Sequence, residues 1–283
     1  MKSLIAVVLV LIFSGFPAKA GPVDLDRDTL FVGHSLVAFD MPAILQHFMA
    51  HAGGSGRTEV QVINGAPLSY NWKNGATAQG LDARSVLPSG RFGALVLTEA
   101  IPLESHLMYS ATVETAAQYH ALATAADSAA QVFIYETWHD LRSGTGAEIE
   151  WDVETDLTWR ERIEAAYPGW MSIVEGVNNQ SAAGSKPVRL IPAGQAMGAL
   201  QDAIDARQVP GIDAIGDLFD DTIHFNATGA YFVALVMAET IYGIDAPSLP
   251  YHVPLADHGE HRIAEETARA LQAIAAKTVA ATE

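Results

Sequence analysis

The sequence predicts an α/β fold in which helices cover both faces of a parallel sheet. Its strand candidates are nearly continuous apolar runs, which is typical of strands that are buried on both faces. Segments with helical periodicity separate these runs, as expected for a chain that alternates strands and helices. The strands are predicted at 29–32, 59–63, 94–97, 132–135 and 188–191, and the main helices at 42–51, 112–129, 158–176, 194–206 and 227–241.

Local signals support the boundaries of these elements in chain order. The first strand ends at Gly33, and Pro42 stands in the first turn of the next helix, where its missing N–H leaves no hydrogen bond unmade. The second strand stops at Asn64-Gly65, a dipeptide typical of turns. Residues 141–156, after the fourth strand, are rich in Gly, Ser, Thr and acidic residues and are expected to form a loop that shapes a substrate entrance.

The chain is predicted to contain three parts. Residues 1–20 combine Lys2, an apolar run and a break at Pro17 before a small-residue cleavage site, which is the layout of a secretory signal peptide. Residues 21–245 are expected to form one domain. Residues 246–283 are expected to form a Pro-punctuated linker and a helix at about 260–280 that packs on the domain. We therefore expect a secreted protein, periplasmic or extracellular, from a bacterium.

Composition excludes several classes of partner and chemistry. The net charge is −17 from 33 acidic and 16 basic residues, and removal of Lys2 and Lys19 with the signal peptide makes it −19. Such an acidic surface repels nucleic acid and anionic lipid headgroups. No run after the signal peptide reaches the roughly 18 apolar residues that a membrane span needs, so no stable membrane insertion is expected. The absence of cysteine excludes disulfides and thiolate metal sites.

Two short segments at opposite ends of the domain carry the chemistry. Ser35 falls where the first strand turns into a loop, and Asp221 and His224 precede the last strongly apolar helix. A serine hydroxyl needs an imidazole base, and the imidazole needs a carboxylate that holds it in the right tautomer. The spacing lets Asp221 accept from one ring nitrogen while the other faces Ser35, with Asp220 as a rival orienter. Taken singly, each segment also reads as a helix or turn cap.

The two segments resemble a known family. Gly33-His34-Ser35-Leu36 resembles the nucleophile block of the SGNH hydrolases, also called GDSL esterases and lipases, with His34 in place of the usual Asp, and Asp221 with His224 resembles their carboxy-terminal block. The resemblance covers about residues 28–243. It implies a flavodoxin-like three-layer α/β/α sandwich, no metal or organic cofactor, and an oxyanion site in which the backbone N–H of Gly65 joins that of Ser35.

One block departs from the family pattern. After the third strand the family has Gly-x-Asn-Asp, whose Asn is a third oxyanion donor, but this chain has Leu97-Thr98-Glu99-Ala100. Loss of one such donor typically costs about 10²- to 10³-fold in rate. The candidates for a replacement are the Thr98 hydroxyl, a neutral Glu99 and the side-chain amides of Asn64, Asn71 and Asn74. Alternatively, Glu99 binds substrate or braces a neighbouring side chain.

The end of the fourth strand offers further candidates for substrate binding. Glu136 and Trp138 stand on the same predicted rim as Ser35, where a carboxylate could bind hydroxyls and a flat ring could face a sugar or an acyl chain. Both could equally be structural residues that close the rim of the core. Two histidine pairs, His47 with His51 and His258 with His261, lack a third ligand at a recognised zinc spacing, so no metal site is predicted.

These observations predict a secreted serine esterase that hydrolyses carboxylic esters, with acetylated or short-acyl carbohydrate as the first expected substrate. Ser35 is the predicted nucleophile, His224 the base and Asp221 its orienter, and Thr98, Glu99, Glu136 and Trp138 are weaker candidates for substrate contacts. Two alternatives remain open. An acyltransferase would use the same triad, and a carbohydrate-binding protein that has lost catalysis would explain the missing Asn.

Overall fold

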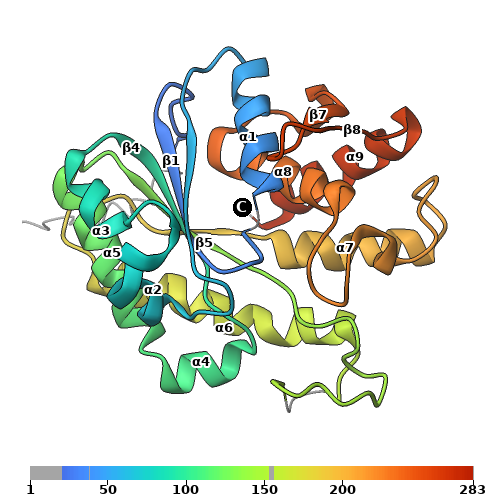
Figure 1. Ribbon diagram of the computed structural model, residues 1–283, viewed down its shortest axis with the longest axis horizontal. Coiled ribbons are helices and arrows are strands. Elements are labelled where there is room, and N and C mark those ends of the chain that lie inside the picture. Colours follow the sequence, from blue (N-terminus) through green and yellow to red (C-terminus); the bar gives the residue numbers. More distant parts are fainter. Residues whose placement is uncertain (1–20, 38, 153–155, 283) are drawn as a thin grey trace, which may run out of the picture.

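A twisted sheet forms the centre of the molecule (Figure 1). The structure is a computed structural model that describes residues 21–37, 39–152 and 156–282. The predicted signal peptide, residues 1–20, lies outside the described residues. Among the described helices, none is both long and apolar enough to cross a membrane.

The order of the strands in the sheet confirms the predicted fold class. The order is β3-β2-β1-β4-β5-β6, and every pair is parallel except β2 with β3. Without the two-residue edge strand β3, this is the 2-1-3-4-5 order of flavodoxin-like doubly wound sheets. The strands are β1 (Asp28–Gly33), β2 (Thr58–Val62), β3 (Gln79–Gly80), β4 (Phe92–Leu97), β5 (Gln131–Tyr135) and β6 (Arg189–Ile191).

Successive residues of the central strands enter two different cores, one on each face of the sheet. In β1, Phe31 packs into the first core, while Leu30 and Val32 pack into the second. This alternation follows from the two-residue period of a strand, and it requires apolar side chains at consecutive positions because both faces are covered. The helices that cover the first face are α1 (Asp40–His51), α7 (Ala193–Asp205), α8 (Ala227–Tyr242) and α9 (Glu265–Thr282). Those on the second face are α2 (Leu68–Asn74), α3 (Ala83–Val86), α4 (Leu103–Tyr109), α5 (Thr112–Ala126) and most of α6 (Trp159–Gln180).

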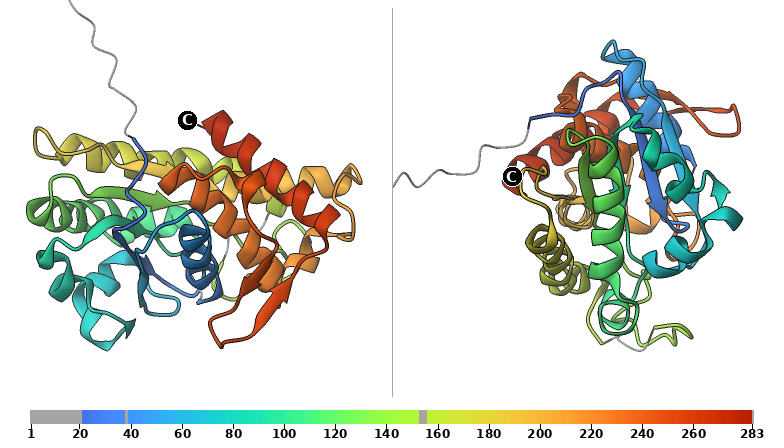
Figure 2. Two further views of the ribbon diagram at one scale, coloured as in Figure 1. Left: turned by 90° about the horizontal axis from the view of Figure 1, so that it is seen from above. Right: turned by 90° about the vertical axis from the view of Figure 1, so that its left-hand side faces the viewer.

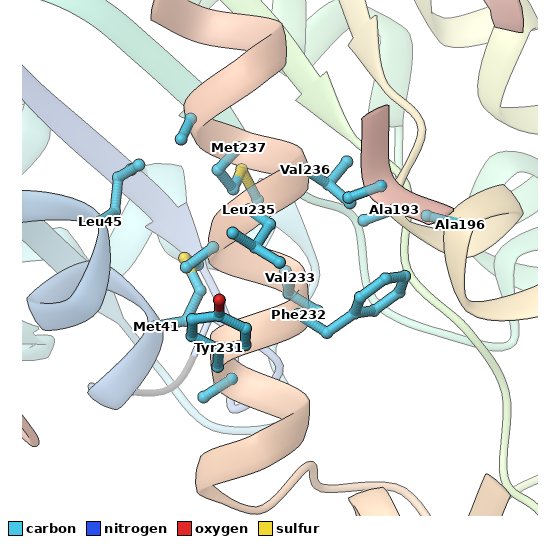
Figure 3. Close-up of a cluster of buried hydrophobic side chains, with 14 of the residues drawn as sticks. Met41, Leu45, Ala193, Ala196, Tyr231, Phe232, Val233, Leu235, Val236 and Met237 are labelled. Carbon is cyan, nitrogen blue, oxygen red and sulfur yellow. The ribbon is translucent and has the colours of Figure 1, made fainter. Parts of the chain in front are cut away.

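Helix α8 lies inside the first layer and is buried on nearly all sides. Figure 3 shows Tyr231, Phe232 and Val236 of this helix among side chains of α1 and α7. A helix that is apolar all round is stable only when it is surrounded by protein. The Asn226 side chain accepts from the N–H groups of Thr228 and Gly229 and so caps the first turn. The start of α8, three residues after His224, is therefore held by the packing of the helix and by its Asn226 cap.

The carboxy-terminal segment differs from the prediction in one respect. The helix predicted at about 260–280 begins only at Glu265, because residues 260–262 form strand β8, which pairs antiparallel with β7 (His252–Pro254). Strand pairing between segments with no clear alternation cannot be read from local periodicity. Helix α9 lies alongside α8, and the hairpin extends away from it (Figure 2). Leu271 and Ala275 of α9 are fully buried in the first core.

Candidate active site

The loops that follow β1, β2 and β4 meet at one edge of the sheet. Chain crossovers leave β1 and β4 in opposite directions, and such a switch point opens a crevice at the carboxyl ends of the strands. A pocket of about 400 Å³ lies there. Its lining includes Ser35 after β1, Gly65 after β2, Ala100 after β4, His106 of α4, Trp151 and His224.

Ser35, His224 and Asp221 form a continuous chain of hydrogen bonds. Ser35 Oγ lies 2.9 Å from His224 Nε2, and His224 Nδ1 lies 2.7 Å from Asp221 Oδ2. The second oxygen of Asp221 accepts the backbone N–H groups of Ile223 and His224 at 2.8 and 2.7 Å. The carboxylate therefore holds both the ring and the backbone of the histidine. The arrangement fits Nδ1–H donating to Asp221 and Nε2 accepting from the Ser35 hydroxyl.

The electrostatics of Asp221 suit an orienting carboxylate. Partial burial would raise its pKa, but the hydrogen bonds from His224 and Ile223 outweigh burial and hold the pKa below the ordinary value. The group is therefore ionised at neutral pH. The rival orienter, Asp220, contacts His224 through its backbone N–H, which donates to the His224 carbonyl at 2.9 Å. Of the two acids, the carboxylate at the imidazole is that of Asp221.

The loop that carries Asp221 and His224 is fastened to the end of β5. The Trp138 Nε1–H donates to the Ile223 carbonyl at 2.9 Å, and its ring packs between Phe219 and Phe225 on either side of the loop. The backbone N–H of Leu141 donates to the Thr222 carbonyl at 2.7 Å. The two residues between the acid and the base, Thr222 and Ile223, are thus bonded to the segment that follows β5.

A buried carboxylate adds a further bond to the same loop. Asp140 accepts the Thr222 hydroxyl at 2.8 Å and pairs with Arg142 at 2.8 Å. Burial would raise the pKa of Asp140, but the hydrogen bonds from Arg142 and Thr222 lower it by more. An ionised Asp140 can therefore accept from both groups at once.

The Ser35 loop is tied to the loop after β4 by His34. The His34 ring is buried, its Nε2 lies 2.9 Å from the Glu99 carbonyl, and its Nδ1 accepts weakly from the Leu36 N–H at 3.4 Å. Burial lowers the pKa of His34 to about 4, so the ring is neutral. Gly33 lets the loop approach β4 closely, because a Cβ there would stand 2.4 Å from Thr98 Cγ2.

The two residues whose backbone N–H groups were predicted to bind the oxyanion, Ser35 and Gly65, both line the pocket. Gly65 lines the pocket with a φ of +67°, a value that favours glycine. Within the described part of the chain, the N–H groups of Ser35 and Gly65 donate to no other atom. These donors are the two predicted for the oxyanion, and both belong to residues that line the pocket.

Thr98 and Glu99 do not line this pocket, contrary to the expectation that they contact substrate. Both are buried, and the Thr98 hydroxyl points to the Glu99 carbonyl at 3.4 Å. The Glu99 carboxylate accepts the Leu68 N–H at 3.1 Å, and the Ala100 N–H and the Thr112 hydroxyl at 2.7 Å each. Burial raises the pKa of Glu99, and these three donors oppose that shift. These bonds indicate that Glu99 holds the segments of Leu68, Ala100 and Thr112 together rather than contacting a ligand in the pocket.

Glu136 and Trp138 are likewise buried away from the pocket lining. Glu136 accepts the backbone N–H of Gln195 at 3.1 Å and the side-chain amide of Gln195 at 2.9 Å, so it caps the start of α7. Trp138 holds the His224 loop as described above. A position at a strand end predicted function for these residues, but their side chains turn toward neighbouring elements rather than toward the crevice.

Two pocket residues, His106 and Trp151, were not among the predicted site residues. His106 lies on α4, a helix of seven residues that is too short for a clear periodicity, and Trp151 lies in the predicted entrance loop. Only the loop prediction could have pointed to Trp151, whose side chain is 44% exposed at the pocket. In the described residues there is no group of three His, Cys, Asp or Glu side chains that could hold a metal ion.

Comparison with known proteins supports the fold. No protein-family model and no curated protein matches the chain. A DUF4886 family protein from Bacteroides uniformis superposes with a TM-score of 0.66 at 18% identity, over 90% of this chain and 95% of that one. A protein described as a GDSL-like lipase, from Parabacteroides merdae, superposes with a TM-score of 0.50 at 12% identity, over 78% and 97%. Together with the sheet order, these likenesses show that the chain has the fold of the SGNH hydrolases.

Proposed function

We propose that this protein is a serine esterase that hydrolyses short-acyl carboxylic esters. The single observation that carries the proposal is the hydrogen-bonded chain from Ser35 Oγ through His224 to Asp221, which reaches the wall of an open pocket. The side chains of His224 and Asp221 are 43% and 54% exposed, so solvent and substrate reach them. A hydroxyl, an imidazole and a carboxylate in this order are the groups that acyl transfer to serine requires.

Each group has one role in the proposed reaction. Ser35 Oγ attacks the ester carbonyl carbon while His224 Nε2 takes the hydroxyl proton, and the new C–O bond places negative charge on the former carbonyl oxygen. The N–H groups of Ser35 and Gly65 stabilise that oxygen. His224 then returns the proton to the leaving alcohol as the bond between carbon and the alcohol oxygen breaks. Water hydrolyses the acyl-enzyme by the same steps, and Asp221 stabilises the imidazolium throughout.

The pocket supports short acyl groups. Leu36, Ile101, Pro102 and Ile223 give it an apolar lining beside Ser35, and about 400 Å³ is near the lower end of ordinary ligand sites. Trp151, partly exposed at the same pocket, offers a flat face to a sugar ring. We propose acetylated or short-acyl carbohydrate as the substrate class. The predicted signal peptide supports export as a further part of the proposal.

The test is hydrolysis of p-nitrophenyl acetate and butyrate by the mature protein. Ser35→Ala and His224→Ala are compared with Ser172→Ala and His51→Ala, which remove an exposed serine of α6 and an exposed histidine of α1. A fluorophosphonate label mapped by mass spectrometry should fall on Ser35 in the wild type. Activity lost only in the first two variants supports the esterase. Equal rates in all five proteins with no label on Ser35 would overturn it and favour a binding protein.

A further inference from the structure

We propose that His106 supplies the third oxyanion donor, through its Nε2–H, in place of the Asn that this chain lacks. The inference rests on the proposed esterase function and deepens it. Its starting point is that His106 lines the same pocket as Ser35, Gly65 and His224. Three donors from three different segments of the chain, two loops and helix α4, would then surround the oxygen on which charge develops.

The other predicted replacements are occupied elsewhere. The Thr98 hydroxyl and the Glu99 carboxylate are bonded away from the pocket, as described above. The Asn71 amide is buried and lies 3.3 Å from the Ala66 carbonyl, and the Asn74 amide donates to the Tyr70 carbonyl at 3.0 Å. Neither Asn64 nor these two residues line the pocket.

Among the described residues that line the pocket, five side chains carry an N–H or O–H group. They are His34, Ser35, His106, Trp151 and His224. Ser35 and His224 are the proposed nucleophile and base, and the Nε2–H of His34 is used by the Glu99 carbonyl. The choice falls between His106 and Trp151. Trp151 is 44% exposed, whereas His106 is half-buried, and preorganised donors act most strongly where water is excluded.

The surroundings of His106 favour a donor at Nε2. Its Nδ1 lies 2.9 Å from Ser110 Oγ, one turn further along the chain. If the Ser110 hydroxyl donates to Nδ1, the ring proton stands on Nε2. Burial lowers the pKa of His106, so the ring is uncharged at neutral pH. A neutral imidazole in this tautomer offers one N–H without the cost of burying a charge.

Backbone contacts hold the histidine firmly. The His106 carbonyl accepts the Ser110 N–H at 2.8 Å and the Thr112 hydroxyl at 3.1 Å. The one proton of the Thr112 hydroxyl is shared with Glu99 Oε2, which lies 2.7 Å from Thr112 Oγ1, and Glu99 also accepts the N–H of Leu68, three residues after Gly65. Glu99 thus links the end of α4 to the loop that carries Gly65. Glu99 stands where the family has its third oxyanion donor. In this chain, Glu99 positions the segments of two proposed donors, His106 and the Gly65 N–H, instead of supplying a donor itself.

Variants of His106 separate this role from alternatives. His106→Ala should lower kcat for p-nitrophenyl acetate about 10²- to 10³-fold with little change in KM, because an oxyanion donor acts mainly on the transition state. His106→Asn, which keeps an N–H donor, should recover part of kcat. Ser110→Ala should lower kcat less than His106→Ala does. Met108→Ala, an exposed side chain on the same helix, is the matched control and should match the wild type.

The outcomes distinguish the inference from the proposed function. If the wild type hydrolyses the ester through Ser35 but His106→Ala keeps its kcat within about threefold, the oxyanion role of His106 is wrong. A rise in KM alone would also contradict it and make His106 a substrate-binding residue. If the wild type shows no turnover that depends on Ser35, the proposed function fails first and the inference with it. Thermal melting of each variant checks that the fold is intact.

Discussion

Replacing Trp138 by Phe tests whether the end of β5 positions the His224 loop. The change removes the Nε1–H that donates to the Ile223 carbonyl at 2.9 Å, and it keeps an aromatic ring between Phe219 and Phe225. The Ile223 carbonyl then loses its indole partner one residue before the proposed base. We expect the loop to sample other positions and the distance from His224 to Ser35 to vary more widely.

The magnitude follows from two terms. A lost hydrogen bond that leaves a partly buried carbonyl without its donor costs about 1–3 kcal/mol. Loss of the indole's second ring from a fully buried site adds about 1 kcal/mol for the void. The free energy of unfolding should therefore fall by about 2–4 kcal/mol, and kcat should fall about 10- to 100-fold, since small misplacement of a catalytic group has effects of this size.

Trp159→Phe is the matched control. Trp159 is also buried, packs edge-on against Phe219 and donates its Nε1–H to a backbone carbonyl at 2.8 Å, but that carbonyl belongs to His139 rather than to the loop of Asp221 and His224. Both variants should lose similar stability in thermal melts, and Trp138→Phe alone should lose much of its kcat. Equal kcat in the two variants, or a higher KM with unchanged kcat for Trp138→Phe, would refute the positioning role.

Three further predictions concern other parts of the structure. Asp221→Asn should lower kcat by about 10⁴-fold with little change in stability, because an amide favours the wrong tautomer of the imidazole, and steady-state kinetics would show a much smaller loss if Asp220 could take over. Burial raises the pKa of Glu136 to about 7, so the folded state binds more protons than the unfolded chain, and stability should fall as pH rises from about 4.5 to 7. Glu136→Gln should remove that part of the pH dependence, and equal slopes of Tm against pH in both proteins would contradict the assignment. Gly33→Ala should destabilise by about 1–3 kcal/mol because its Cβ meets Thr98 Cγ2, and adding Thr98→Ser, which removes that methyl group, should restore part of the loss in denaturant unfolding, while strictly additive effects would contradict the clash.

The sequence by itself determined the sheet and its main helices. Strands buried on both faces need apolar residues at every position, so runs such as 94–97 and 132–135 are visible without knowledge of their neighbours. Elements that form only by pairing or packing with other segments could not be predicted from the sequence. The β7–β8 hairpin forms by pairing, and α2 and α4 are helices of seven residues whose positions depend on packing.

The same distinction applies to the candidate site. Ser35, Asp221 and His224 could be predicted because chemistry restricts which residues can act together, and because strand ends of a parallel sheet meet at one edge. The directions of the side chains could not be predicted, because a position at a strand end does not determine which neighbour a buried group will contact. Only the tertiary structure turned Glu99 toward Thr112 and Trp138 toward Ile223, and brought His106 to the pocket. A buried polar group must find a partner, and distant segments of the chain supply it.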